Sequence, residues 1–576
     1  MPQLIFNGQR LYFPGAGFLT KPDTTPSEQF ILEITTTSSD QEITIPHLSN
    51  YTYNYTVEYG DGNEKTVTSY NDSGATNIYS TPGTYQLKIS GTCESIFINN
   101  GGTLKDTINK VVSWGLTDLK SINFNGCSNL TEITTDRLGS FGDIYSLAYS
   151  FQNCTSLKEV PVGFLDYATT LTTFYYTFSG CGALTTIPNG LFDNTILSNV
   201  TRCFQNCSSL TSIPNGLFDT FNISDFTSVF SNCSSLTSIP TGLFDDCTNA
   251  TKFISTFYNC SLITSIPDGL FDNNTSVDDF STTFRGTSIT SIPEGLFDHC
   301  PNVLNFYQVF STTNITSIPD GLFDNNTLVE NFNSTFTTTN ITSIPEGLFD
   351  NCPNISSLSR TFSSTNITSI PDSLFDNNLL VETFDYVFSD TDITSLPTGL
   401  FDFNTGVTSF YGVFNQCSSL TGITEGIFDN NILVDDFANA FTQCTSLTSI
   451  PDGLFDNNIK VTTFSNTFSR CENITSIPSG LFDSCTGVTS FAYTFLYCYD
   501  LTSIPSGLFD SLNAVISFDS TFYGCNSLTG NSEELWLKGD NTLSAPDYNS
   551  GTPEGNNCYF ACSGLSDVAS IPLYWK

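Results

Sequence analysis

The sequence predicts an α/β repeat solenoid of about 15 coils of 26–27 residues, preceded by a small all-β sandwich. The first observation is a proline that recurs every 26 or 27 residues, and the second is that the residues around it repeat in phase. Such a period indicates stacked units that bury their apolar faces against one another. The recurring prolines are Pro161, Pro188, Pro214, Pro240, Pro267, Pro293, Pro319, Pro345, Pro371, Pro397, Pro451, Pro478 and Pro505, with Thr424 where one more is expected.

The chain begins with two segments that do not repeat. Residues 1–28 are rich in Gly and Pro toward their end, which suits a linker or an anchoring arm. Residues 29–92 alternate apolar and polar side chains in runs such as Tyr53–Tyr59 and Thr84–Ile89, and Asp61-Gly62 reads as a turn between strands. Several short strands in so few residues predict a β-sandwich.

The turn and the late strand of this segment resemble the PKD domain family. The matching residues are Tyr59-Gly-Asp-Gly62 and Tyr79-Ser-Thr-Pro-Gly-Thr-Tyr85, with Tyr59 in place of the tryptophan usual in that family. The resemblance implies an Ig-like sandwich that acts as a spacer or adhesion module, without catalysis.

The rest of the chain divides into an N-terminal cap, the array and a C-terminal cap, according to how closely each part matches the repeat. Residues 93–126 contain one degenerate coil and predict an N-terminal cap, and residues 127–530 are the array itself. Residues 531–576 predict a C-terminal cap, with an insertion at 531–557 that carries Trp536. Terminal coils of a solenoid need a covered apolar face, so atypical ends are expected.

Each coil is expected to hold one strand and one or two short helical segments. The run Ile289-Thr-Ser-Ile292 has β-branched residues at period two and predicts a strand that pairs in parallel with its neighbours. Val277, Phe280 and Phe284 are spaced three and four apart, which is typical of one buried helical stripe. At strand spacing the array predicts a rod about 70 Å long.

The unit Phe522-Tyr-Gly-Cys-Asn-Ser-Leu-Thr529 resembles the BspA-type leucine-rich repeat, whose coils carry a Phe-x-x-Cys-x-x-Leu-x-x-Ile motif. The resemblance covers about 400 residues in phase. It implies surface-exposed binding and adhesion proteins, and similar arrays occur in virion proteins of gut (Bacteroidales, crAss-like) bacteriophages. This array differs by its longer coil and by an added Gly-Leu-Phe-Asp.

Most of the 19 cysteines occupy one repeat position, three residues after a phenylalanine. Side chains in such a column lie parallel and lack the crossed geometry of a disulfide. We therefore expect buried free thiols that act as small apolar groups. No short-spaced Cys/His cluster suggests zinc. The cysteines of the column are Cys127, Cys154, Cys181, Cys207, Cys233, Cys260, Cys417, Cys444, Cys471, Cys498 and Cys525.

In five successive coils this cysteine is replaced by threonine, and the spacer that follows loses one residue. We favour duplication of a variant coil as the interpretation, with a distinct recognition patch as the alternative. The replacing residues are Thr287, Thr313, Thr339, Thr365 and Thr391.

The formal net charge of −40, with only 17 Lys and Arg, argues against a nucleic-acid partner. No apolar run is long enough to predict membrane insertion, and Met1 is followed by no recognisable secretory signal. The two histidines, His47 and His299, lie in different domains, which argues against a histidine-based triad. A paired-carboxylate glycan hydrolase stays open, because 57 Asp and Glu always allow such a pair.

Two acidic columns are the candidate binding residues. The Asp that ends each Gly-Leu-Phe-Asp recurs in every coil, and its carboxylates need compensation. We favour Asx-type bonds to the Asn-Asn backbone that follows, with calcium as the alternative and no other cofactor expected. The calcium candidates are Asp272, Asp298, Asp324 and Asp350. The second column, next to the proline, is read as a solvated face or as a surface for a cationic or carbohydrate partner, through Asp268, Glu294, Asp320, Glu346 and Asp372.

These observations predict a non-enzymatic surface protein of a bacteriophage virion, on the capsid or the tail. Residues 1–92 would contact other virion proteins, and the solenoid would contact a host surface glycan or protein. The alternative is a bacterial cell-surface or secreted BspA-like adhesin, and a glycan-active enzyme comes third.

Overall fold

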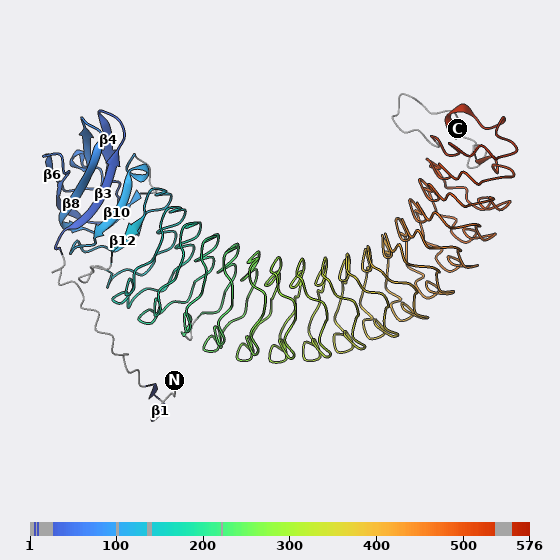
Figure 1. Ribbon diagram of the computed structural model, residues 1–576, viewed down its shortest axis with the longest axis horizontal. Helices are drawn as coiled ribbons and strands as arrows, with labels where there is room; N and C mark the ends of the chain where they lie inside the picture. The colour runs from blue at the N-terminus through green and yellow to red at the C-terminus, as the bar shows by residue number, and fades with distance from the viewer. Residues whose placement is uncertain are drawn as a thin grey trace.

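A computed structural model describes residues 5–6, 9–10, 27–98, 103–134, 141–219, 223–535 and 556–576. The chain forms a long arc, with a strand-rich domain at the N-terminal end and stacked coils along the rest (Figure 1). Most of the expected leader 1–28, and the insertion with Trp536, lie outside the described residues. Within the leader, β1 (Ile5–Phe6) pairs antiparallel with β2 (Gln9–Arg10).

The N-terminal domain is built on a six-stranded sheet of order β12-β10-β3-β8-β5-β6. The pairings among β10, β3, β8, β5 and β6 are all antiparallel, and β12 pairs in parallel with β10. The strands are β3 (Phe30–Thr36), β5 (Tyr53–Glu58), β6 (Glu64–Val67), β8 (Gly83–Cys93), β10 (Ile108–Ser113) and β12 (Glu132–Ile133).

In the described residues, two smaller sheets and two short 3-10 helices complete this region, and a third 3-10 helix lies at the other end of the chain. The pairs are β4 (Gln41–Thr44) with β7 (Thr76–Tyr79), antiparallel, and β9 (Ser95–Phe97) with β11 (Ser121–Asn123), parallel. The 3-10 helices are η1 (Ser73–Ala75), η3 (Leu104–Asp106) and, at the C-terminus, η5 (Leu573–Trp575). The strand-rich N-terminal region predicted from the alternation of residues 29–92 is confirmed.

The main sheet continues beyond residue 92 into the expected cap. Strand β10 pairs with β3, and β12, which is part of the first coil, extends the sheet by one more strand. Buried Trp114 contacts the rings of Phe30 in the sheet and of Phe124 and Phe164 in the first coils. The sheet therefore covers the apolar end of the array.

The prediction of a helical segment in each coil is wrong, and the array is therefore not α/β. The phenylalanine segment instead forms consecutive four-residue turns, closed by Thr283 N–H to the Phe280 carbonyl (3.1 Å) and by Thr287 N–H to the Phe284 carbonyl (3.2 Å). The third residue of each turn has positive φ, 56° at Thr282 and 73° at Gly286, as in type II turns. Two such turns place phenylalanines four residues apart on one side, which is the spacing that a helix would give.

Other N–H groups of the phenylalanine segment, which do not close the turns, donate to backbone carbonyls of the next coil. Phe280 and Thr282 donate to the carbonyls of Asn305 and Tyr307 in the next coil (3.1 and 2.8 Å), and Phe284 and Gly286 continue the same ladder. A nearly continuous series of isolated parallel bridges runs through this segment from Asp225 to Ser517. We name it the hydrogen-bond ladder.

The predicted parallel pairing therefore lies mainly in a different segment. Ile289-Thr-Ser-Ile292 takes part in two backbone bonds between coils: Thr290 N–H donates to the Thr264 carbonyl (3.3 Å), and the Ile289 carbonyl accepts from Asn314 N–H (3.0 Å). Bridges within this part of the coil occur near the start of the array, at Glu159, Thr186 and Ser212. Leu and Ile at either end of the segment point inward, and the Thr-Ser pair stays at the surface.

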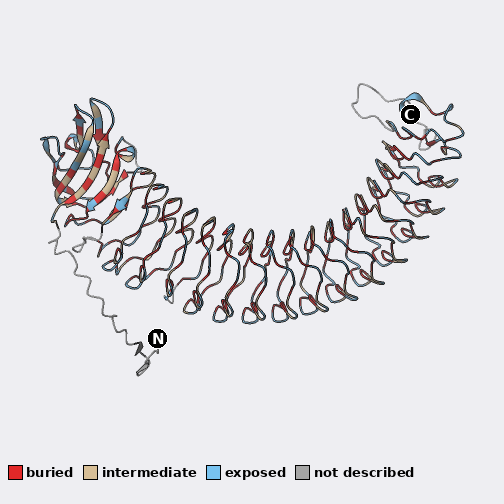
Figure 2. Cartoon of the chain, viewed as in Figure 1, coloured by how far each residue is buried: buried red, intermediate tan, exposed pale blue. Residues whose placement is uncertain are grey.

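The core consists of three columns of phenylalanine, with one ring of each column in a typical coil. Phe280 and Phe306 stack with ring centroids 6.0 Å apart and planes 4° apart, and Phe284 and Phe310 stack in the same way. Rings of different columns meet at steep angles, as for Phe271 and Phe280, at 4.7 Å and 57°. Buried residues line the interior of every coil in Figure 2.

The array curves into an arc, where the sequence predicted a rod (Figure 1). The ladder holds the phenylalanine segments together along one side of the coils. In the described residues no backbone hydrogen bond joins successive Pro-x-Gly-Leu-Phe-Asp turns, so these turns are free to spread apart.

Candidate functional site

The acidic turn of a typical coil is closed by a glycine with positive φ, and in one coil Ser373 takes this place with a φ of 61°. In the coil of Asp272, the Asp272 N–H donates to the Gly269 carbonyl (3.2 Å), and Gly269 has a φ of 68°. A Cβ at Gly269 would lie 2.9 Å from Asp272 Oδ2, so the carboxylate folds back over the glycine. Glycine is favoured here because of both its φ and its missing side chain.

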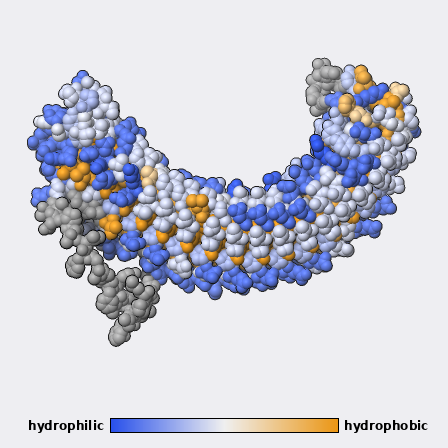
Figure 3. Space-filling model, viewed as in Figure 1, coloured by the Kyte–Doolittle hydropathy of each residue, from blue (hydrophilic) through white to orange (hydrophobic). Residues whose placement is uncertain are grey.

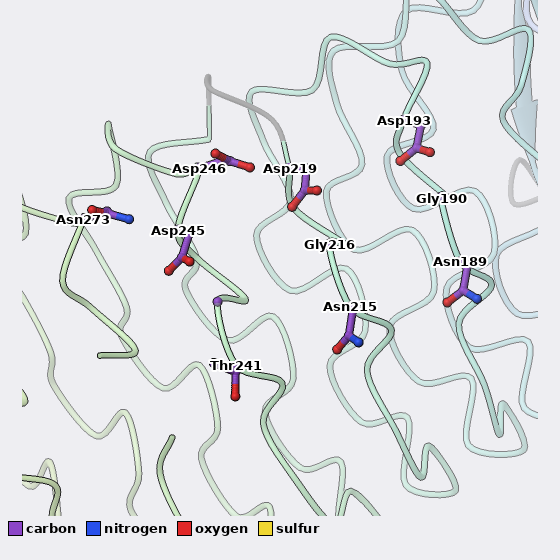
Figure 4. A pocket seen from close by; sticks show the side chains of 11 residues that line it. Asn189, Gly190, Asp193, Asn215, Gly216, Asp219, Thr241, Asp245, Asp246 and Asn273 are labelled. Carbon is purple, nitrogen blue, oxygen red and sulfur yellow. The ribbon is translucent and has the colours of Figure 1, made fainter. Parts of the chain in front are cut away.

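These turns set the two predicted acidic columns side by side on one surface, the acidic face. Its grooves run between successive turns. One groove, of about 540 Å³, is lined by Glu294, Asp298, Asp320 and Asp324 with neighbouring Gly and Asn residues. A second, of about 800 Å³, lies nearer the N-terminus, where Asn189, Asn215 and Thr241 replace the acids next to the proline. Figure 4 shows the Asp193, Asp219 and Asp245 carboxylates in a row along it.

All nine predicted site residues lie on this face, and each is exposed. In the calcium row, Asp324 Oδ1 accepts a hydrogen bond from Asn351 Nδ2 (3.2 Å), and Asp272 Oδ1 lies 3.4 Å from His299 Nδ1. No group of three or more His, Cys, Asp or Glu side chains close enough to hold a metal occurs in the described ranges. Calcium binding by this row stays a hypothesis.

The favoured Asx-type bonds from these four carboxylates to the backbone that follows are not formed in the described chain. The second Asn of Asp-Asn-Asn is instead buried and bonds to the preceding coil. Asn274 Nδ2 donates to the carbonyls of Phe244 (3.1 Å) and Cys247 (2.9 Å). Other coils carry cysteine at this position, as at Cys300, whose Sγ lies 3.6 Å from the Asn274 carbonyl.

The main cysteine column is buried and each thiol is free. Cys260 Sγ lies 3.1 Å from the carbonyl of Phe230, one coil earlier, and its neighbours repeat this S–H bond. Burial raises the pKa of the Cys260 and Cys417 thiols to about 12. A protonated thiol is a weak nucleophile, so this column is structural.

The five threonines that replace cysteine are also buried. The Thr287 hydroxyl donates to the Phe284 carbonyl of its own coil (2.7 Å), and Thr313, Thr339 and Thr365 do the same. The replacement turns a bond between coils into a bond within one coil. These side chains therefore display nothing to a partner.

A second surface lies over the hydrogen-bond ladder. We name its two positive-φ turn positions the display columns; side chains there range from buried, as at Ser228, to exposed, as at Tyr149 and Arg360. The fold accepts small residues there, such as Ser228 and Ser334 (both φ 57°). Several coils nevertheless carry large side chains: Tyr149, Tyr176, Arg202, Gln308, Arg360, Tyr386, Arg470, Tyr493 and Tyr497.

The large residues of the display columns gather in clusters of Arg and Tyr. Near the N-terminal end Tyr149 stacks on Tyr176 (5.3 Å), and the Arg202 guanidinium lies over the Tyr176 ring (5.3 Å). In the middle, Arg360 lies over Tyr386 at 4.6 Å. Burial, followed by the hydrogen bond with Tyr411, raises the pKa of Tyr386 to about 12.

Glycines in the next coil make room for these rings. A Cβ at Gly412 would lie 2.4 Å from the Tyr386 ring, and one at Gly524 would lie 2.4 Å from the Tyr497 ring. The Arg470 guanidinium lies over Tyr497 at 5.0 Å.

The arginines of these clusters have no acidic partner in the part of the chain that the structure describes. The ion pairs there are Lys110–Glu132, Lys120–Glu94 and His299–Asp272. A guanidinium without a carboxylate keeps its charge for an external group, which is unusual on a chain of net charge −40.

The sequence predictions missed these display columns. The signal was present, because Tyr and Arg occupy the same repeat positions at which other coils carry Gly, Asn or Ser. It could be recognised only once the phenylalanine segment was known to form turns with positive φ.

Among the described residues, no helix is long and apolar enough to cross a membrane.

Comparison with known proteins supports the repeat assignment. The family model described as "BspA type Leucine rich repeat region", with six copies, matches residues 117–241, 174–303, 211–352 and 330–440. None of the curated proteins matches the chain significantly.

Solved structures with leucine-rich repeats are similar at low identity. A TLR13–ssRNA13 complex is 12% identical, with coverage of 73% of this chain and 83% of the other and a TM-score of 0.29. An internalin (InlF) from Listeria monocytogenes is 14% identical, with coverage of 59% and 84% and a TM-score of 0.29. A plant peptide hormone receptor, RGFR1, in complex with RGF2, is 12% identical, with coverage of 70% and 80% and a TM-score of 0.32. No functional role is carried over from them.

The family match together spans more than half of the chain, and it coincides with coils whose Phe and Cys positions form continuous buried columns. The chain therefore belongs to the BspA-type leucine-rich repeat family.

Proposed function

We propose that this protein is a non-enzymatic surface adhesion or recognition protein, and that it contacts its partner through the display columns over the hydrogen-bond ladder. The family is typical of surface or secreted interaction modules. The observation that carries the proposal is the presence of Tyr and Arg at positions whose backbone favours Gly or Asn.

Large residues at these positions have a backbone cost that the phenylalanine core does not offset. Positive φ costs a residue other than Gly about 1 kcal/mol. The side chains there point out of the coil and add nothing to the phenylalanine core. Because Ser228 and Ser334 satisfy the same backbone, the Arg and Tyr clusters are explained by contact with an external partner.

The partner that suits this face is a host surface glycan or a surface protein. Tyrosine supplies flat apolar area with a hydrogen-bonding hydroxyl, and an unpaired guanidinium binds carboxylate or other planar acceptors. The acidic face, with Asp268, Glu294, Asp320, Glu346 and Asp372, is a second candidate surface, suited to a cationic group.

A cluster variant with a matched control tests the recognition surface. Arg360→Ser combined with Tyr386→Ser should abolish binding to the cells or glycans that the unmodified chain binds. The fold should be retained, since serine occupies the equivalent position at Ser334. The control is Asp372→Asn with Asp376→Asn on the acidic face. Unchanged binding by the cluster variant, with lost binding by the control, would move the site to the acidic face.

The finer proposal is display on a bacteriophage virion, with residues 1–92 as the attachment end and the solenoid facing outward. The family resemblance supports it, and so does a core of free thiols that needs no oxidising compartment to form. The alternative is a BspA-like adhesin of the bacterial surface. Cryo-electron microscopy of particles, with antibodies against the two ends of the chain, separates the two. Labelling of bacterial surface fractions alone would favour the adhesin.

A further inference from the structure

Four consecutive coils carry an exposed apolar patch just after the acidic turn. The side chains are between 37 and 62% exposed. Hydrogen bonds from buried Asn404, Asn431 and Asn458 to the carbonyls of Asn378, Asn404 and Asn431 fix the register, so the residues on either side of these asparagines lie next to each other on successive coils. The patch, from the yellow to the orange coils of Figure 1, comprises Leu379, Leu380, Phe403, Ile432, Leu433 and Ile459.

The fold does not require these apolar side chains. Other coils have Thr275-Ser276, Pro301-Asn302 or Pro353-Asn354 at the positions of Leu379-Leu380, with the same inward-pointing Asn or Cys before them. The patch is therefore a local feature of these coils. Adjacent exposed apolar side chains of this kind mark an interaction surface more often than single ones do. Figure 3 shows that hydrophobic residues also reach the visible surface in a row along the array and near both ends of the molecule, among neutral and hydrophilic residues.

The patch is bordered by carboxylates. Residues 371–460 contain 13 Asp and Glu and one basic residue, Lys460. The acidic face lies immediately before the patch in each coil, with Asp376, Asp402, Asp429 and Asp456, and Glu382 and Asp435 follow it. A second copy of this chain is a poor occupant, because a two-fold contact would bring these carboxylates against their own equivalents.

We infer that this patch is a docking site for a cationic amphipathic helix of another protein, independent of the recognition surface proposed above. Beside the patch, the phenylalanine rings of successive acidic turns stack 6.1–6.3 Å apart, close to the helical pitch of about 5.4 Å. A helix along the array therefore places about one apolar residue per turn over one coil, for about three turns. Lys or Arg on its flanks then lies over the bordering carboxylates.

The test uses the full chain and a labelled synthetic helix of about 14 residues, with Leu on one face and Lys on the other. Fluorescence anisotropy gives Kd at about 0.15 M salt, where long-range attraction is screened. The patch variant is Leu379→Thr, Leu380→Ser, Ile432→Thr and Leu433→Ser, which copies Thr275-Ser276. The matched control replaces apolar side chains exposed elsewhere in the array, Leu262→Thr and Ile516→Thr.

The patch variant should raise Kd about ten-fold or more, because it removes the apolar contact and leaves every charge in place. The control variant should bind like the unmodified chain, and thermal unfolding followed by circular dichroism should be alike for all three. A peptide with Ser in place of Leu should not bind.

Three results would overturn the inference. Equal binding of the Leu and Ser peptides would show attraction by charge alone. An unchanged Kd for the patch variant would place the peptide elsewhere. Sedimentation showing a dimer that the patch variant loses would make a second copy the occupant.

Discussion

Phe297 is the position at which the phenylalanine core can be tested most directly. Its ring is fully buried and contacts five others: Phe280 and Phe306 at 4.9 and 4.6 Å, and Phe271, Phe310 and Phe323 at 6.1–6.3 Å. Phe297→Ala leaves a cavity between rings held by three coils, which should cost about 4 kcal/mol. Phe297→Leu keeps most of the volume and should cost about 1.5 kcal/mol.

Because each coil contacts only its neighbours, this loss should stay local. Hydrogen exchange followed by mass spectrometry should show the ladder amides of Phe284 and Phe306 exchanging about a thousand-fold faster in Phe297→Ala, since about 1.4 kcal/mol corresponds to ten-fold. Amides near Phe464 should keep their protection. The control is Leu304→Ala, which changes a partly exposed side chain of the same coil. Acceleration below ten-fold, or spread evenly along the array, would refute the view that the rings stabilise each coil through its neighbours.

Three further outcomes are expected. The 19 buried thiols should resist iodoacetamide at pH 8 in the native chain and all react in denaturant, and modification of an array cysteine without unfolding would contradict their high pKa. Burial lowers the pKa of His47 to about 4, so the unfolded state binds more protons and the N-terminal domain should lose stability as pH falls from about 6.5 to 4; thermal melts of His47→Gln should lack this dependence. Gly524→Ala places a Cβ 2.4 Å from the Tyr497 ring at a φ of 75° and should cost about 1–2 kcal/mol in thermal melts, part of it recovered by adding Tyr497→Ser.

The repeat and its core could be predicted from the sequence, because period and phase are visible in the residues themselves. Phe280 and Phe284 were rightly expected to be buried on one side. The prediction of a helix for this segment was wrong, because a helix and two successive turns both place phenylalanines four residues apart on one side. The sequence does not reveal whether the N–H groups bond within the coil or to the next coil.

The candidate surfaces also fall into those that the sequence could predict and those that it could not. The column of Asp272 could be predicted because the coils from Pro161 onward repeat it, and that of Asp268 because several coils in the middle of the array carry an acid next to the proline. Tyr386 and Arg360 could not, because their outward direction depends on positive φ, which only the turn geometry reveals. The patch around Leu379 breaks the repeat in a few coils, and its exposure follows from the buried Asn378 beside it.

The ladder also gives the array a direction. In a typical coil three or four ladder N–H groups point toward the C-terminal neighbour, and the carbonyls that accept them point back, so the dipoles of these peptide groups add along the arc. Each contributes about 3.5 D, and the sum has its positive pole at the C-terminal end, opposite to an α-helix. There the last N–H groups donate to the closing residues, Asn557 to Tyr574 and Tyr559 to Trp575. The ladder side of the array is therefore electrically polar along its length, while bonds elsewhere in the coil, such as that from Leu304 N–H to the Asp278 carbonyl, point the opposite way and offset part of this dipole.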